Sequence, residues 1–214
     1  AITVVPPKHT GLNNEKHVNI GSLNVPRGSR LIWEITTEKT DTLQFKIKNN
    51  TSVLTKQKTD HFRVEKRIRN NTKYEITLAN SNVSFIDTTF YDINVFSDSH
   101  PTISISSEET NKSQLPVIAG AIRDDYGFLK LESFVRVYGA SRDTLIKRPV
   151  EINTSLRSQS FISPFNGTNL EFETGEILDF YFIVTDNDAP SKYKKTVSET
   201  ITFNAPTIEE FQEE

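Results

Sequence analysis

Short runs in which every second residue is hydrophobic recur along this chain, separated by polar turn residues. In the run at 30–35, Leu31, Trp33 and Ile35 fall on one side of an extended segment. The same period of two recurs at 43–47, 62–64, 74–78 and 91–95. Because successive side chains of a strand point to opposite faces, this pattern predicts half-buried strands. No segment before the C-terminus sustains the 3.6-residue period of a helix, so the pattern favours a β-sandwich.

The pattern restarts after residues 97–101, which have the turn-like sequence Ser-Asp-Ser-His-Pro. New strand-like runs follow at 102–106, 117–122 and 128–138, and a closing pair lies at 178–184 and 196–203. Between 139 and 163 both alternation and turn signals are irregular. We therefore expect an all-β chain of two tandem immunoglobulin-like β-sandwich domains, at 1–99 and 100–206. Residues 207–214 form an acidic tail whose threonine and early glutamates suit a helix start.

Composition excludes several classes of protein and site. The 214 residues allow two domains that each bury a core. A net charge of −3 gives no electrostatic basis for binding nucleic acid or an anionic membrane surface. The chain has no cysteine, which excludes disulfides and thiolate zinc sites. No apolar stretch approaches the roughly 20 residues of a membrane span, so we expect no membrane contact by this segment itself.

The start of the chain indicates a piece of a longer protein. Its first residues, Ile2-Thr3-Val4-Val5, are already strand-like, and the chain contains no methionine. We therefore expect a larger parent protein. The composition of this segment alone does not indicate the cellular compartment of that parent.

The sequence contains no recognisable set of catalytic residues, so we expect that the protein is not an enzyme. The chain lacks a Gly-x-Ser-x-Gly nucleophile motif and a Gly-Lys-Ser/Thr phosphate-binding loop. Its four histidines, at 9, 17, 61 and 100, are widely spaced and have no carboxylates at metal-ligand spacing. The basic run at 192–195 is more typical of an edge strand that resists aggregation than of a ligand site. Trp33 is the expected core anchor of the first domain, and Pro6-Pro7 are expected in a kinked edge strand.

Two acidic turn sequences in the second half carry the strongest candidate site. Asp124-Asp125-Tyr126-Gly127 and Asp186-Asn187-Asp188 each follow a hydrophobic run. In an immunoglobulin-like sandwich, the turn after the second strand and the last hairpin turn lie at the pole where the chain enters the domain. The expected cluster consists of Asp98, Asp124, Asp125, Asp186 and Asp188.

Such a cluster has two interpretations. Several carboxylates around one junction would suit a hard cation such as Ca²⁺, as in tandem adhesion domains that calcium stiffens. Alternatively, the aspartates form Asx-turns and pair with Arg123 or with nearby lysines. Because turn aspartates are common, we favour the Asx-turns and expect neither a metal nor another cofactor.

Two segments carry a resemblance to a known family. Residues 6–12, PPKHTGL, and residues 21–29, GSLNVPRGS, resemble the PPxYTGL opening and the following strand of repeated Ig-like domains in large bacterial membrane proteins of uncharacterised function. His9 stands where that family usually has tyrosine. Later matches are Pro101-Thr102-Ile103 and the two acidic turns, which are similar to the family's second Ig-like unit.

The resemblance implies an extracytoplasmic region of a membrane-anchored bacterial parent, in the periplasm or cell envelope, and it implies no activity. We therefore expect a non-catalytic spacer or protein-interaction region whose protein partner the sequence does not identify. The alternative is a calcium-dependent adhesion or glycan-binding module. An exposed aromatic platform would favour glycan binding, whereas an apolar strip or a free strand edge would favour protein contact.

Overall fold

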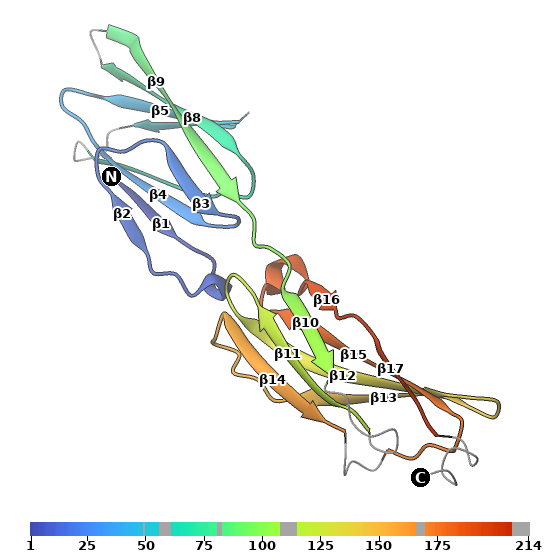
Figure 1. The fold of residues 1–214 in the computed structure, drawn as a ribbon. Helices are drawn as coiled ribbons and strands as arrows, with labels where there is room; N and C mark the ends of the chain where they lie inside the picture. Colours follow the sequence, from blue (N-terminus) through green and yellow to red (C-terminus); the bar gives the residue numbers. More distant parts are fainter. Residues whose placement is uncertain (49, 56–60, 81–82, 108–114, 166–169, 207–214) are drawn as a thin grey trace. The chain divides into compact units, whose positions relative to one another are not determined.

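The chain is built almost entirely from β-strands. The computed structural model describes all residues except 49, 56–60, 81–82, 108–114, 166–169 and 207–214, which include the whole expected acidic tail (Figure 1). The chain divides into two compact units, Ala1–Asp98 and Ser99–Glu214. We call them the first and the second domain and describe each by itself.

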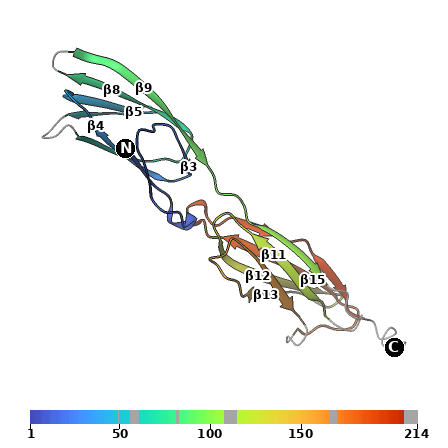
Figure 2. The ribbon, with the colours of Figure 1, turned by 60° about the vertical axis from the view of Figure 1, so that its left-hand side comes forward.

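The first domain has two sheets, with strand orders β2-β1-β4-β7 and β3-β9-β8-β5-β6. All strand pairs are antiparallel except β3–β9, which is parallel. The long β8–β9 hairpin is visible from both directions (Figures 1 and 2). The elements are β1 (Ile2–Val5), η1 (Lys8–Thr10), β2 (Glu15–His17), β3 (Leu23–Pro26), β4 (Arg30–Thr36), β5 (Thr42–Ile47), β6 (Asn50–Thr55), β7 (His61–Arg67), β8 (Thr72–Asn80) and β9 (Val83–Phe96).

The second domain also has two sheets. One has the order β10-β11-β14, and the other has β13-β12-β15-β16, with β17 also pairing with β15. The elements are β10 (Thr102–Ser107), β11 (Val117–Arg123), β12 (Phe128–Tyr138), β13 (Asp143–Val150), β14 (Ser158–Pro164), β15 (Ile177–Asp186), η2 (Ala189–Ser191), β16 (Lys195–Val197) and β17 (Ile201–Asn204).

Both domains have the strand arrangement of an immunoglobulin-like sandwich. In the second domain the first, second and fifth strands form one sheet, and the remaining strands form the other. The first domain repeats this division, with its opening segment shared between sheets: β1 pairs with β4, and β3 pairs with β9. Consecutive strands thus cross between sheets, as in Greek-key sandwiches. The predicted fold of two tandem immunoglobulin-like β-sandwiches is confirmed.

Trp33 is the centre of the first core. It is 1% exposed and packs edge-on against Phe45 at 4.9 Å and Tyr74 at 5.2 Å between ring centroids. The Tyr74 hydroxyl donates to the Gly21 carbonyl at 2.8 Å, and Tyr91 stacks on the Tyr74 ring. Burial raises the pKa of Tyr74 to about 12. Gly21 has to be glycine because a Cβ there would overlap the Tyr91 ring.

The second core is separate from the first and is dominated by phenylalanine. Phe180 and Phe182 of β15 are completely buried, and Phe161 of β14 packs against Phe182. Phe161 also lies across Gly120 of β11, where an added Cβ would come 2.5 Å from the Phe161 ring and 2.7 Å from the Ser104 carbonyl oxygen. Glycine in the middle of this strand therefore makes room for a large neighbouring ring.

Several strands differ from the sequence expectation. The irregular stretch 139–163 contains two regular strands, β13 and β14. The run at 196–203 is split into β16 and β17, and residues 198–200 between them have no ladder partner on β15, although the Ser198 N–H still donates to the Phe182 carbonyl at 2.9 Å. Pro6-Pro7 do not lie in an edge strand: they follow β1, and Pro7 caps η1. Proline at this point ends the strand, since it has no N–H for a ladder.

Within the two segments that carry the family resemblance, Thr10 and Ser29 form turns of the first domain. Thr10 is buried, its hydroxyl donates to the Pro7 carbonyl at 2.8 Å, and Gly11 follows in the left-handed region at φ 63°. Ser29 is buried as well, and its hydroxyl donates to the Pro26 carbonyl at 2.7 Å. These hydrogen bonds give the motif residues a structural role.

Candidate functional site: the acidic pole of the second domain

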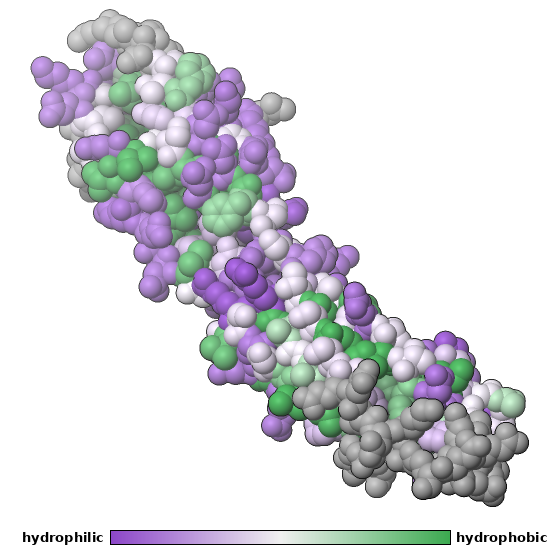
Figure 3. Space-filling model, viewed as in Figure 1, coloured by the Kyte–Doolittle hydropathy of each residue, from purple (hydrophilic) through white to green (hydrophobic). Residues whose placement is uncertain are grey.

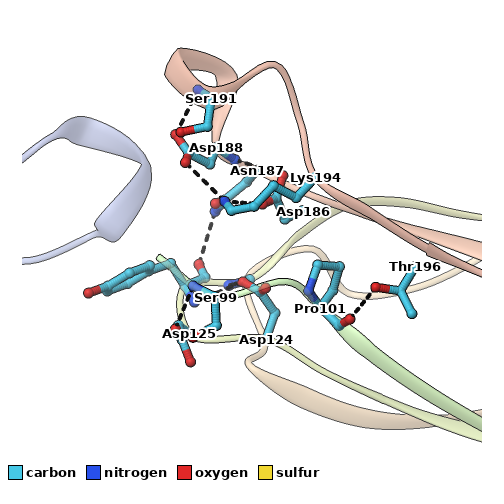
Figure 4. A network of polar contacts seen from close by, with 12 residues as sticks. Ser99, Pro101, Asp124, Asp125, Asp186, Asn187, Asp188, Ser191, Lys194 and Thr196 are labelled. Carbon is cyan, nitrogen blue, oxygen red and sulfur yellow. Dashed lines mark hydrogen bonds and ion pairs between the residues drawn. The ribbon is translucent and has the colours of Figure 1, made fainter. Parts of the chain in front are cut away.

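Three segments of the second domain meet at one pole, and we call residues 99–101, 124–127 and 186–194 together the acidic pole (Figure 4). The Ser99 N–H donates to Asp125 at 3.0 Å, and the Asn187 side-chain amide donates to the Tyr126 carbonyl at 2.9 Å. The Pro101 carbonyl accepts from the Thr196 hydroxyl at 2.5 Å. The structure thus joins the entry of the chain, the β11–β12 turn and the β15–β16 connection.

Asp124 organises the β11–β12 turn. One of its carboxylate oxygens accepts from the backbone N–H groups of Tyr126 and Gly127, both at 2.9 Å. Gly127 has φ of 106°, and a Cβ there would lie 2.7 Å from the Thr154 carbonyl oxygen. These are the Asx-type hydrogen bonds of a turn aspartate, with a glycine where no side chain fits.

Asp186 and Asp188 share one lysine. The Lys194 ammonium lies 2.7 Å from Asp186 Oδ2 and 3.0 Å from Asp188 Oδ2. The exposed fractions of the two aspartates are 0% and 3%. Each carboxylate also accepts a backbone N–H, that of Asp188 at 3.2 Å and that of Ser191 at 3.3 Å. The second of these bonds caps the short helix η2.

The Lys194 ammonium lies between these two carboxylates and contacts both. A calcium ion needs roughly six to eight oxygen ligands, and it would have to displace Lys194 from Asp186 and Asp188. Buried carboxylates are tolerated when a partner cation and hydrogen bonds compensate for the lost hydration. With these contacts, both aspartates stabilise the connection between β15 and β16.

The five sequence-derived site residues are thus distributed over both domains. Asp124, Asp125, Asp186 and Asp188 lie at the acidic pole, whereas Asp98 is the last residue of the first domain. Asp125 binds the entering chain, and the other three hold turns.

Lys194 corrects the interpretation of the basic run. Its side chain is 13% exposed and belongs to a buried ion-pair network, whereas Lys195 is exposed on β16. The two residues before it, Lys192 and Tyr193, adopt left-handed φ values of 67° and 58°. Such conformations cost about 1 kcal/mol or more for residues other than glycine. Only Lys195 therefore suits the expected role at an edge strand.

Sequence reasoning missed a second charged pair, away from the acidic pole. Arg142, in the β12–β13 turn, binds both carboxylate oxygens of Glu176 at 2.8 Å. Glu176 is 4% exposed and also accepts the Glu173 N–H at 2.7 Å. The Arg142 guanidinium, with this backbone donor, holds the pKa of the Glu176 carboxyl below its usual value. The one available signal was the turn sequence Thr174-Gly175, shortly before the predicted strand at 178–184.

No family model matches the sequence, and neither does a curated protein. Among solved structures, the chain is similar to a putative carbohydrate binding protein from Bacteroides uniformis, at 11% identity and a TM-score of 0.30, over 79% of this chain and 90% of that one. It is also similar to fibronectin(III)-like modules of Clostridium thermocellum CbhA, at 11% identity and a TM-score of 0.28, over 88% and 90%. A third similarity is to the D00-D0 domain of intimin, at 10% identity and a TM-score of 0.25, over 95% and 99%. The fold assignment rests on the strand order and register given above.

Among the described residues, no helix has the length and apolarity needed to cross a membrane.

Proposed function

We propose that this chain is a non-catalytic spacer and protein-interaction region on the extracytoplasmic side of a larger, membrane-anchored bacterial protein. The resemblance of residues 6–12 and 21–29 to the Ig-like repeats of such proteins supports the location, in the periplasm or cell envelope. The protein partner is to be identified from the parent protein.

The observation that carries the spacer role is the way in which the chain enters the second domain. Strand β9 ends at Phe96 and β10 begins at Thr102, so only residues 97–101 connect the two domains. Within this connection, the Ser99 N–H and the Pro101 carbonyl are hydrogen-bonded to the body of the second domain, through Asp125 and Thr196. A connection with little free length restricts the motion of one domain against the other, as a spacer requires.

A separate core in each domain supports the same function. Trp33 and its neighbours form one hydrophobic cluster, and Phe180 and its neighbours form another. Each domain has a hydrophobic core of its own. Domains of this kind can therefore be joined in series without one depending on the packing of the next.

The spacer role is tested by measuring interdomain motion in solution. Small-angle scattering and NMR relaxation should show a narrow distribution of interdomain distances and one common tumbling time for both domains. The double variant Asp125→Ala/Thr196→Val should broaden the distribution, and a Gly-Ser insertion between Asp98 and Ser99 serves as the flexible reference. If the unaltered chain is as broadly distributed as the insertion variant, the spacer proposal is wrong.

A further inference from the structure

Strand β14 is an edge of the β10-β11-β14 sheet, and in the described part of the chain no strand pairs with its outer side. Its hydrogen-bonding pattern follows from the residue just before it, because the Asp124 N–H donates to the Arg157 carbonyl at 2.9 Å. The residues of an antiparallel strand face its partner and face away from it in alternation, so the odd-numbered residues of β14 face β11. The backbone groups that point outward from the edge are those of Ser158, Ser160 and Ile162.

This edge carries no charge that would keep another strand away. The residues of β14, Ser158–Pro164, include no Lys, Arg, Asp or Glu. Strand β13, an edge of the other sheet, carries several charges, which is how many sheets avoid pairing with other chains. Strand β10 is uncharged but shorter, and Pro101 directly before it accepts a hydrogen bond from Thr196 of β16. Among the described strands of the second domain, β14 is therefore the longest uncharged edge.

Ile162 adds an exposed apolar side chain to this edge. It is 68% exposed and lies on the outer face of the sheet, beside its ladder partner Ala119. The neighbouring Phe161 points to the opposite face and is buried in the core. Figure 3 shows the outer face over β10, β11 and β14, where the surface is mostly pale to green. A further strand beside β14 would remove Ile162 from water, which the fold of one chain does not do.

We propose that β14 pairs with β14 of a second copy of this chain, in antiparallel register about a twofold axis at Phe161. This register pairs the whole strand with itself and places Ser160 opposite Ile162 of the second copy. The outward N–H and C=O groups of these residues then bind each other, and with the strand ends they give about six backbone hydrogen bonds. Pro164 has no N–H to donate, but it lies at the last position of the strand, where proline is tolerated at an edge.

A second copy fits this edge because the pairing is self-complementary. The twofold axis makes the two Ile162 side chains diagonal neighbours on the outer face, so that each helps to cover the other. No charged side chain of β14 is brought against its own copy, so the paired strands do not repel each other. The interface is isologous, which is the commonest way in which identical chains associate.

This inference rests on the interaction part of the proposed function and identifies one partner as another copy of the chain. A single pair of strands buries less surface than a standard protein interface, so we expect a dissociation constant on the order of 100 µM. Parent proteins anchored in one membrane would associate more readily than free chains, because anchoring raises their effective concentration.

Sedimentation velocity of the whole chain, at concentrations that bracket the expected dissociation constant, tests the pairing. The chain should change from monomer to dimer as its concentration rises. Ile162→Lys places a cation beside its own copy across the axis and should weaken the dimer at least tenfold. Leu145→Lys is the matched control, because it changes a side chain 55% exposed on the edge strand β13, and it should associate like the unaltered chain.

Cross-linking tests the register. The chain has no cysteine, so Ser160→Cys and Ile162→Cys each introduce a single thiol. A mixture of the two variants should form a disulfide-linked dimer faster than either variant alone, since opposite residues of a hydrogen-bonded pair lie about 5.5 Å apart between Cα atoms.

Three results would overturn the proposal: a chain that stays monomeric, unchanged association of folded Ile162→Lys, or a mixture that cross-links no faster than its components. Because sedimentation does not report interdomain motion, the self-pairing fails or succeeds independently of the spacer role.

Discussion

The Lys194 ammonium lies 2.7 Å from a carboxylate oxygen of Asp186, and that aspartate is completely buried. This pair, extended by Asp188, fixes the connection between β15 and β16 and thereby the pole at which the chain enters the second domain. It gives two buried carboxylates of an acidic sequence a cation from the chain itself.

Replacing Lys194 by methionine tests this support. Lys194→Met leaves Asp186 and Asp188 buried without their cation, so the second domain should lose on the order of 3–5 kcal/mol of unfolding free energy. Lys195→Met, which changes the exposed neighbour, should stay within about 0.5 kcal/mol of the unaltered chain. Urea unfolding followed by tyrosine fluorescence measures both, and equal stability of the two variants would contradict the assigned role of Lys194.

Trp33 should be essential to the first domain alone. Because it packs against Phe45 and Tyr74, Trp33→Ala should cost on the order of 3–5 kcal/mol and unfold the first domain preferentially. The second domain should keep its own transition in calorimetry, since its core is separate. Phe90→Ala, at a side chain 65% exposed, is the matched control and should melt normally. Loss of both transitions together, or an unchanged melting profile, would show that this view of the cores is wrong.

A larger side chain at position 120 should destabilise the second domain, whereas the same replacement at the neighbouring position 121 of β11 should not. Gly120→Val pushes a side chain against Phe161 and the Ser104 backbone and should destabilise the second domain by about 1–3 kcal/mol. Ala121→Val adds to an exposed residue that points to the opposite face, and it should be nearly neutral. Thermal unfolding of the two variants compares them directly, and the opposite ranking would refute the packing described here.

The Arg142–Glu176 pair predicts a pH dependence in acid. The pKa of Glu176 is lowered in the folded protein, so its contribution to stability is present above its unfolded pKa, about 4.3. That contribution is lost as the pH falls through the lowered, folded value. Glu176→Gln should flatten this part of the stability curve of the second domain, and Glu173→Gln, at an exposed neighbour, should not. Urea midpoints measured between pH 6 and pH 3 give the comparison; parallel curves for Glu176→Gln and the unaltered chain would exclude this role.

The sequence predicted those strands whose two faces differ in polarity. Leu31 and Trp33 alternate with polar or less buried neighbours, and so the β4 strand and its buried side were apparent. The strands β13 and β14 were missed because they lie at sheet edges. Leu145 and Ile162 are exposed there, and a period of two then no longer marks the core side.

The sequence also predicted that the acidic turns lie at one pole. It did not predict which residues the aspartates contact there. Asp124 and Asp186 follow hydrophobic runs whose order places their ends at one pole. The partner of Asp186 is eight residues away in a basic run, and nothing in the spacing distinguishes buried Lys194 from exposed Lys195. Directly before Lys194, Lys192 and Tyr193 have left-handed backbone conformations, which an alternating sequence pattern does not predict.

The central prediction is that the acidic pole is held together by Lys194 and backbone N–H groups, and that the second domain folds without a bound metal. Calorimetric titration with Ca²⁺, combined with melting curves at millimolar Ca²⁺, tests it most directly. We expect no binding heat and an unchanged melting temperature. A rise in melting temperature that Asp186→Asn or Asp124→Asn abolishes would contradict the claim and establish a calcium site.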